Sequence, residues 1–171
     1  YSATYTAQQA GVPGLMAAWG FNETTGTTST DSSGNNNTST LLNGLARVLG
    51  KTGNGLSFDG TNDYFTVNNT TSLDVTGNAL TLSMWVNPST TSAGDQLLIG
   101  KHWNTNMTSP YYQYAIELHS NGTKPVFFIG SSSGYQSVAM STNLTKGQWS
   151  HLAVVWNGTQ VQFYVNGVLA S

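Results

Sequence analysis

The chain has 171 residues, enough for one domain with a hydrophobic core, and a formal net charge of −2. Its five basic and seven acidic residues are scattered singly, so the chain has no basic stripe and we expect no nucleic-acid partner. No apolar run approaches the roughly 18 residues of a membrane span, so we expect no membrane insertion. The absence of cysteine excludes disulfides, thiolate catalysis and zinc sites of the cysteine type.

The polar residues of this chain are mostly uncharged. Ser, Thr and Asn make up 60 of the 171 residues, whereas charged residues make up only 7%. Thr and Tyr favour strands, while Asn, Gly and Ser favour turns. No stretch has a convincing apolar period of about 3.6 residues. The composition therefore predicts an all-β protein.

The chain begins with a polar stretch, residues 1–13, that we interpret as a lead-in or linker before a domain at 14–171. A first strand is predicted over 15–21 and a long loop over 24–40. Further strands are predicted in chain order over 55–60, 63–69, 79–88, 96–102, 111–119, 125–130, 135–140, 149–156 and 161–167.

The segment 79–88 shows the cleanest alternation of apolar and polar residues. Its apolar positions Leu82, Met84 and Val86 share one face, and Trp85 lies on the other face with polar neighbours. The Asn157-Gly158 pair predicts a hairpin between the strands on either side of it. We therefore expect two packed antiparallel sheets. The apolar face of 79–88 should share one core with Val161, Phe163 and Val165.

Four stretches carry a resemblance to a known family. They are GLMAAWGFNETTGTTSTDSSGNNNTST, GNGLSFDGTNDYFTV, ALTLSMWVNP and GQWSHLAVVWNGTQVQFYVNGVLAS. In this order the chain resembles the bacterial and archaeal laminin-G-like modules of the concanavalin A-like lectin/glucanase superfamily. The resemblance covers residues 14–171. It implies a jelly-roll sandwich of two antiparallel sheets in an extracellular or cell-surface protein.

The chain departs from this family at its C-terminal end. Family members continue past the YVNG strand with a further hairpin and a closing strand that pairs with the first strand, whereas this sequence stops at Ser171. The resemblance thus implies a sandwich that lacks its C-terminal closing strands. Since an unpaired edge at 15–21 would be unfavourable, we expect the chain to be a fragment or to receive strands from another protein chain.

The carboxylates do not form a catalytic pattern. Glycoside hydrolysis needs two carboxyl groups about 5–10 Å apart. The glutamates are Glu23 and Glu117, and neither has a carboxylate two residues away. Asp59 and Asp63 flank a turn of the FDGTNDY segment, and the resemblance gives His151 a structural position. We therefore expect a protein that is not an enzyme.

A calcium site is implied by the resemblance at the loop that opens with Asp31. Calcium prefers six to eight oxygen ligands, and the sequence Asp-Ser-Ser-Gly-Asn-Asn-Asn is rich in them. Asp31 and Asn36 are the best candidate ligands, and Asn22 is a weaker one. The alternative is a turn in which the Asp31 carboxylate is satisfied by the backbone.

Aromatic side chains are the candidates for binding a polysaccharide or glycan, because their faces stack on sugar rings. Trp19, Trp149 and Trp156 are assigned to the core. The candidate ligand-binding residues are Trp85, His102, Trp103, Tyr111, Tyr112 and Tyr135. For Trp103 and Tyr135, packing within a loop is an equal alternative.

Several Asn-x-Ser/Thr sequons would carry glycans if the source organism glycosylates surface proteins. The candidates are Asn68, Asn106, Asn121, Asn143 and Asn157. Together these features predict an extracellular, non-catalytic carbohydrate-binding or adhesion module of a larger protein. The alternative is a structural subunit of an extracellular filament, virion or cell coat that is completed by strand exchange.

Overall fold

The computed structural model describes residues 12–91, 93–102, 112–131 and 133–171. The chain divides into two compact units, Tyr1–Asp74 and Val75–Ser171. The described residues contain strands and one short 3-10 helix but no α-helix. Nor do they contain a helix with the length and apolarity of a membrane span. The all-β prediction is confirmed.

The first unit contains a small sheet and a separate hairpin. The sheet has the order β1-β2-β5, with antiparallel pairs, and consists of β1 (Thr28–Ser29), β2 (Ser39–Leu42) and β5 (Tyr64–Val67). The hairpin pairs β3 (Ala46–Leu49) with β4 (Asn54–Ser57). The helix η1 (Thr71–Leu73) follows β5.

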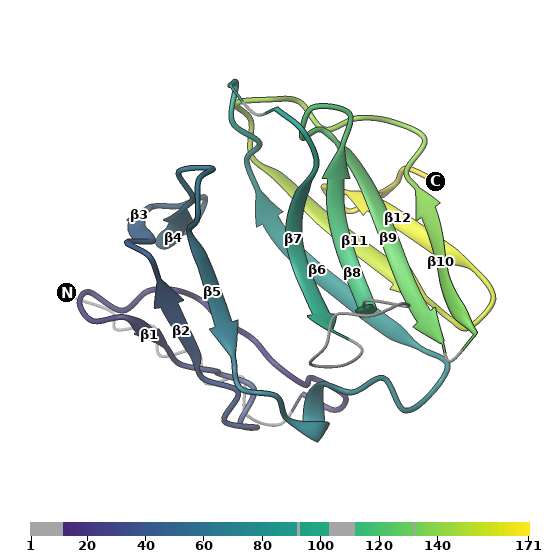
Figure 1. Cartoon of the computed structure of the whole chain (residues 1–171), viewed down its shortest axis with the longest axis horizontal. Coiled ribbons are helices and arrows are strands. Elements are labelled where there is room, and N and C mark those ends of the chain that lie inside the picture. The colour runs from purple at the N-terminus through teal and green to yellow at the C-terminus, as the bar shows by residue number, and fades with distance from the viewer. Residues whose placement is uncertain (1–11, 92, 103–111, 132) are drawn as a thin grey trace. The chain divides into compact units, whose positions relative to one another are not determined.

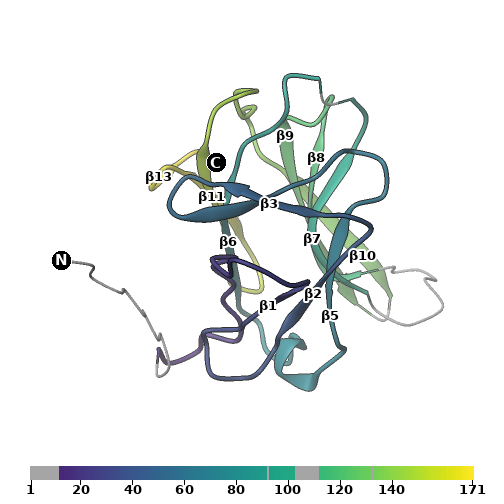
Figure 2. The same cartoon turned by 90° about the vertical axis from the view of Figure 1, so that its left-hand side faces the viewer.

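The second unit consists of two four-stranded antiparallel sheets, which lie one over the other in Figure 1. In the turned view of Figure 2, β6 and β11 lie to one side of β7, β8 and β9. One sheet has the order β10-β9-β8-β7, with β7 (Gln96–His102), β8 (Tyr112–His119), β9 (Lys124–Ser131) and β10 (Gly134–Ala139). The other has the order β13-β12-β11-β6, with β6 (Leu80–Val86), β11 (Ser150–Trp156), β12 (Val161–Val165) and β13 (Val168–Leu169).

The core of the second unit lies between these sheets, because most of their strands carry apolar residues on the face toward the other sheet. Ile116 and Phe127 from one sheet pack in the same cluster as Leu152 and Phe163 from the other. The predicted partners Leu82, Met84, Val86, Val161 and Val165 pack against this cluster, so the predicted face assignment is confirmed. The opposite residues of each strand are left on the outer faces.

Strand prediction was less accurate in the first unit. The predicted strand 15–21 forms only an isolated bridge between Trp19 and Asp31, and the predicted loop 24–40 contains β1 and the start of β2. The reason is that loop side chains, rather than a neighbouring strand, bond the backbone of 15–18. The Met16 carbonyl, for example, accepts hydrogen bonds from Ser33 and Asn37.

The hairpin predicted at Asn157-Gly158 is confirmed, because β11 pairs with β12 on either side of it. A second hairpin joins β12 to β13, and its turn residues explain it. Asn166 and Gly167 have φ angles of 52° and 81°, which suit a two-residue turn with left-handed backbone at both positions. Val165 therefore pairs directly with Val168, the first residue of β13.

The shared core yields a stability prediction. Leu152 is fully buried, so Leu152→Ala should lower the free energy of unfolding by about 2–5 kcal/mol. Thr81→Ala is the control, because Thr81 is exposed on the opposite face of the same sheet and should change stability by less than about 0.5 kcal/mol. Equal losses for the two variants in chemical denaturation would contradict the core.

Candidate functional site

The structure brings three of the predicted aromatic residues onto one sheet. His102 ends β7, Tyr112 begins β8 and Tyr135 lies on β10. Trp85 lies on β6, in the other sheet, whereas Trp103 and Tyr111 lie outside the described residues. Tyr114, Ile116, Leu118 and Phe127 face the core. We call the opposite face of the sheet β10-β9-β8-β7 its outer face.

A bulge at Gln113 turns Tyr112 onto this outer face. Lys101 pairs with Tyr114 and His102 pairs with Tyr112, so Gln113 is the extra residue of a β-bulge between β7 and β8. The rings of His102 and Tyr112 have centroids 5.3 Å apart. Gly100 makes room for the tyrosine, because a Cβ atom there would lie 3.4 Å from a ring carbon of Tyr112.

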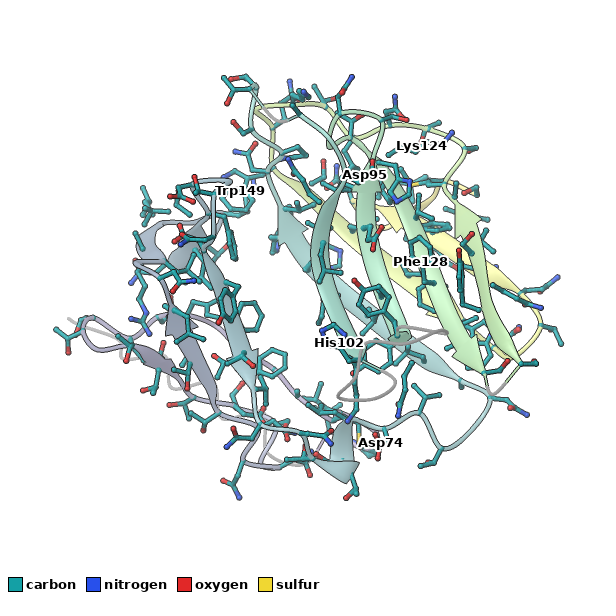
Figure 3. The ribbon with its side chains drawn as sticks, viewed as in Figure 1. Asp74, Asp95, His102, Lys124, Phe128 and Trp149 are labelled. Carbon is teal, nitrogen blue, oxygen red and sulfur yellow. The ribbon has the colours of Figure 1, made fainter. Side chains whose placement is uncertain are left out.

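A row of three rings crosses the outer face. The ring centroids of Tyr135 and Phe128 are 5.9 Å apart, and those of Phe128 and His119 are 6.0 Å apart. Figure 3 shows Phe128 on the sheet that contains β8 and β9. Tyr135 is 53% exposed. We call His119, Phe128 and Tyr135 the aromatic row; sequence reasoning missed its first two members.

Carboxylates surround the His119 end of the row. Nε2 of His119 lies 2.8 Å from Oε2 of Glu117, and its Nδ1 lies 3.7 Å from Oδ2 of Asp95. Burial, and then the charge of Glu117, raises the pKa of the Tyr112 hydroxyl. At neutral pH this hydroxyl is therefore protonated and can donate a hydrogen bond.

A depression lies at the Tyr135 end of the row. It has a volume of about 350 Å³, and its lining includes Ser131, Ser133, Gln136 and Trp156 as well as Tyr135. Trp156 packs against the core, as expected, but it also lines this depression and a second one of about 190 Å³. Its position at the end of β11 explains this double role.

Trp85 has a different setting. It is 46% exposed, and its ring meets that of His151 nearly edge to face, with centroids 5.3 Å apart. Direct pairing of β6 with β11 places these two residues side by side on the outer face of the second sheet. Any ligand at Trp85 would therefore bind on the side of the second unit opposite to the aromatic row.

The Asp31 carboxylate organises the loop that was predicted to bind calcium. Its Oδ1 accepts hydrogen bonds from the N–H groups of Ala18 and Ser33, both at 2.9 Å. Its Oδ2 accepts hydrogen bonds from the Ser33 hydroxyl at 2.8 Å and the Asn37 N–H at 2.9 Å. Burial raises the pKa of Asp31, but these donors outweigh burial and lower it below its usual value.

Asn37 extends this arrangement. Its side chain is buried, with 1% of its surface exposed. Its Nδ2 donates to the Met16 carbonyl, and its Oδ1 accepts from the hydroxyls of Thr70 and Ser72. Its own carbonyl accepts from the indole N–H of Trp19 at 2.7 Å. We call Asp31 and Asn37 with these partners the polar clasp.

The other two predicted calcium ligands lie apart from the clasp. Asn36 is exposed with a φ angle of 60°, and Asn22 accepts a hydrogen bond from the N–H of Asn54. Each Asp31 oxygen already accepts two hydrogen bonds, so this conformation does not fit a cation on that carboxylate. No group of three or more His, Asp or Glu suited to a metal occurs among the described residues. The calcium site stays a prediction.

The remaining candidates fall on turns and loops. Asn68, Asn121, Asn143 and Asn157 are exposed, whereas Asn106 lies outside the described residues. Asp59 and Asp63 stabilise their turn. The Asp63 carboxylate accepts a hydrogen bond from the N–H of Asp59, and the Asp59 carboxylate accepts one from the N–H of Thr61. The use of the sequons stays a prediction.

Comparisons with known proteins place this geometry in a family. The laminin-G-type family model described as the concanavalin A-like lectin/glucanases superfamily matches residues 59–171. The chain belongs to this superfamily. The crystal structure of an S-layer domain-containing protein from Clostridium thermocellum is similar, with 26% identity and a TM-score of 0.61. The match covers 91% of this chain and 70% of that one. No curated protein sequence matches.

The polar clasp predicts loss of stability in acid. The pKa of Glu23 is lowered in the same way as that of Asp31. Burial raises it, but hydrogen bonds from Thr30 and Ser29 and the charge of Arg47 outweigh burial. A lowered pKa stabilises the folded state above the ordinary carboxyl values of 3.8 and 4.5, and this stabilisation disappears as the pH falls through the folded-state values. The melting temperature should fall as the pH drops below about 5, and it should fall less steeply in Asp31→Asn.

The clasp also predicts how Asp31 acts. Asp31→Asn places an NH₂ group among N–H and O–H donors, so it should destabilise the protein by about 1–3 kcal/mol. This loss of stability should be the same in the presence of added calcium and in the presence of a chelator. Asp59→Asn is the control, since Asp59 lies on an exposed turn. A loss of stability that occurs only when calcium is present would instead show that Asp31 is a calcium ligand.

Proposed function

We propose that the chain is an extracellular, non-catalytic module that binds carbohydrate as part of a larger surface protein. The observation that carries this proposal is the aromatic row on the outer face, flanked by hydrogen-bonding groups. The family includes lectins by its description, and the similar crystal structure is that of an S-layer domain-containing protein. Both support a location at the cell surface.

Binding would combine stacking with hydrogen bonds. The exposed ring of Tyr135 offers a face to the apolar side of a sugar ring. Glu117, Asp95 and the Tyr112 hydroxyl lie on or beside the same sheet and can bond sugar hydroxyls. Strands on a packed core hold these groups, so little ordering is needed on binding.

The carboxylates of this face support binding rather than catalysis. Glu117 bonds His119 directly, and Asp95 lies on the other side of the same ring. A glycosidase instead aims two carboxyl groups at one scissile bond. Glu23 is committed to Ser29, Thr30 and Arg47 in the first unit.

A second function, structural subunit of a cell coat, is favoured by the similarity to an S-layer domain-containing protein. Among the described residues, β6, β7, β10 and β13 each pair on one side only, and a strand from another protein chain could extend either sheet. Native mass spectrometry separates the two functions: discrete particles support the binding module, and open-ended polymers support the coat subunit.

The binding proposal predicts which variant loses affinity. On a glycan array the protein should bind at least one polysaccharide, and Tyr135→Ala should weaken that binding by about tenfold or more, equal to about 1.4 kcal/mol. Tyr64→Ala is the matched control, since Tyr64 is 49% exposed but lies on β5 in the first unit.

Trp85→Ala completes the set by testing the other sheet. If this variant loses binding while Tyr135→Ala retains it, the ligand binds at Trp85 and not at the aromatic row. If the protein binds no glycan on the array or in polysaccharide gels, the proposed function is wrong.

A further inference from the structure

The aromatic row crosses the strands instead of following one of them. His119 belongs to β8, Phe128 to β9 and Tyr135 to β10, and these three strands are neighbours in the sheet. Successive ring centroids are 6.0 and 5.9 Å apart. One sugar ring covers about one aromatic ring, so the row provides consecutive stacking positions for an extended chain. An isolated sugar would use only one of them.

The depression borders the Tyr135 end of this row, around the edge strand β10. Tyr135 belongs to both, and the depression adds the hydroxyls of Ser131 and Ser133, the amide of Gln136 and the indole of Trp156. Hydroxyl and amide groups beside an apolar wall are typical of sugar sites, because a sugar presents both hydroxyls and C–H faces. Gln136 pairs with Ile129, which packs against the core, so Gln136 faces the opposite side of β10 from Tyr135. The depression therefore offers a further position around the edge strand β10, beyond the end of the row.

The charges at the His119 end select against acidic ligands. The carboxylates of Asp95 and Glu117 both contact His119, and Lys124 is the register partner of His119 on β9. Figure 3 shows Asp95 and Lys124 near the same end of the sheet. Two carboxylates accept hydrogen bonds from sugar hydroxyls but repel a carboxylated or phosphorylated sugar, and the single lysine does not offset both.

We propose that the ligand is a neutral oligosaccharide segment of three or more units, which lies across β8, β9 and β10 and reaches around the edge strand β10 with one unit in the depression. This inference rests on the proposed function and names its substrate class. The affinity should depend on the length of the oligosaccharide, because each added sugar unit contacts a further ring or enters the depression.

Calorimetric titration with a length series tests the inference. The probes are neutral cello-, xylo- and manno-oligosaccharides of one to five units, with oligogalacturonides as the acidic counterpart. In the series that binds, affinity should rise about tenfold or more from one unit to three and then level off. A monosaccharide that binds as tightly as the longer probes, or a preference for the acidic series, overturns this inference alone. Absence of binding to every probe and to the glycan array overturns the proposed function with it.

A variant of the depression gives an independent readout. Gln136→Ala should reduce the gain in affinity that comes from added sugar units, and it should leave the melting temperature unchanged because Gln136 is exposed. Gln148→Ala is the matched control, because Gln148 is also exposed but lies on the turn before β11. An unchanged length dependence in Gln136→Ala contradicts a sugar position in the depression.

Discussion

The second unit depends on the alternation of side chains along its strands, which buries one face of each sheet in a shared core. Ile116 and Phe127 are held in that core with Phe163. Their neighbours Glu117 and Phe128 must then lie on the outer face. The bulge at Gln113 breaks the alternation in β8, and it adds Tyr112 to that face. The candidate site is thus a direct consequence of how the core is packed.

The first unit is held together in a different way. Its buried groups include Asp31, Ser33, Asn37 and Ser39, so polar contacts replace much of the apolar packing found in the second unit. A buried polar group is tolerated only when its hydrogen bonds are made, and the Asp31 and Asn37 side chains make theirs within the clasp. The resemblance to a calcium-binding loop and this hydrogen-bonded loop rest on the same residues, since oxygen-rich sequences serve both purposes.

The sequence predicted the second unit well because alternation is a local signal. The strand at 96–102 has the observed bounds, and the apolar face of β6 was assigned correctly. The aromatic row was not predicted as a unit, because His119, Phe128 and Tyr135 meet only through the register of three strands. The error at 15–21 has a similar cause. An apolar run suggested a strand, but its hydrogen-bond partners are side chains of the loop beyond it, at Ser33, Asn35 and Asn37.

The most direct test of the account is an NMR titration of the intact chain with the glycan that it binds most tightly. The side-chain resonances of His119, Phe128 and Tyr135 should shift together with those of Gln136, while those of Trp85 and Tyr64 stay unchanged. Shifts confined to Trp85 and His151, or spread over the first unit with none at the aromatic row, would contradict a binding face on the sheet β10-β9-β8-β7.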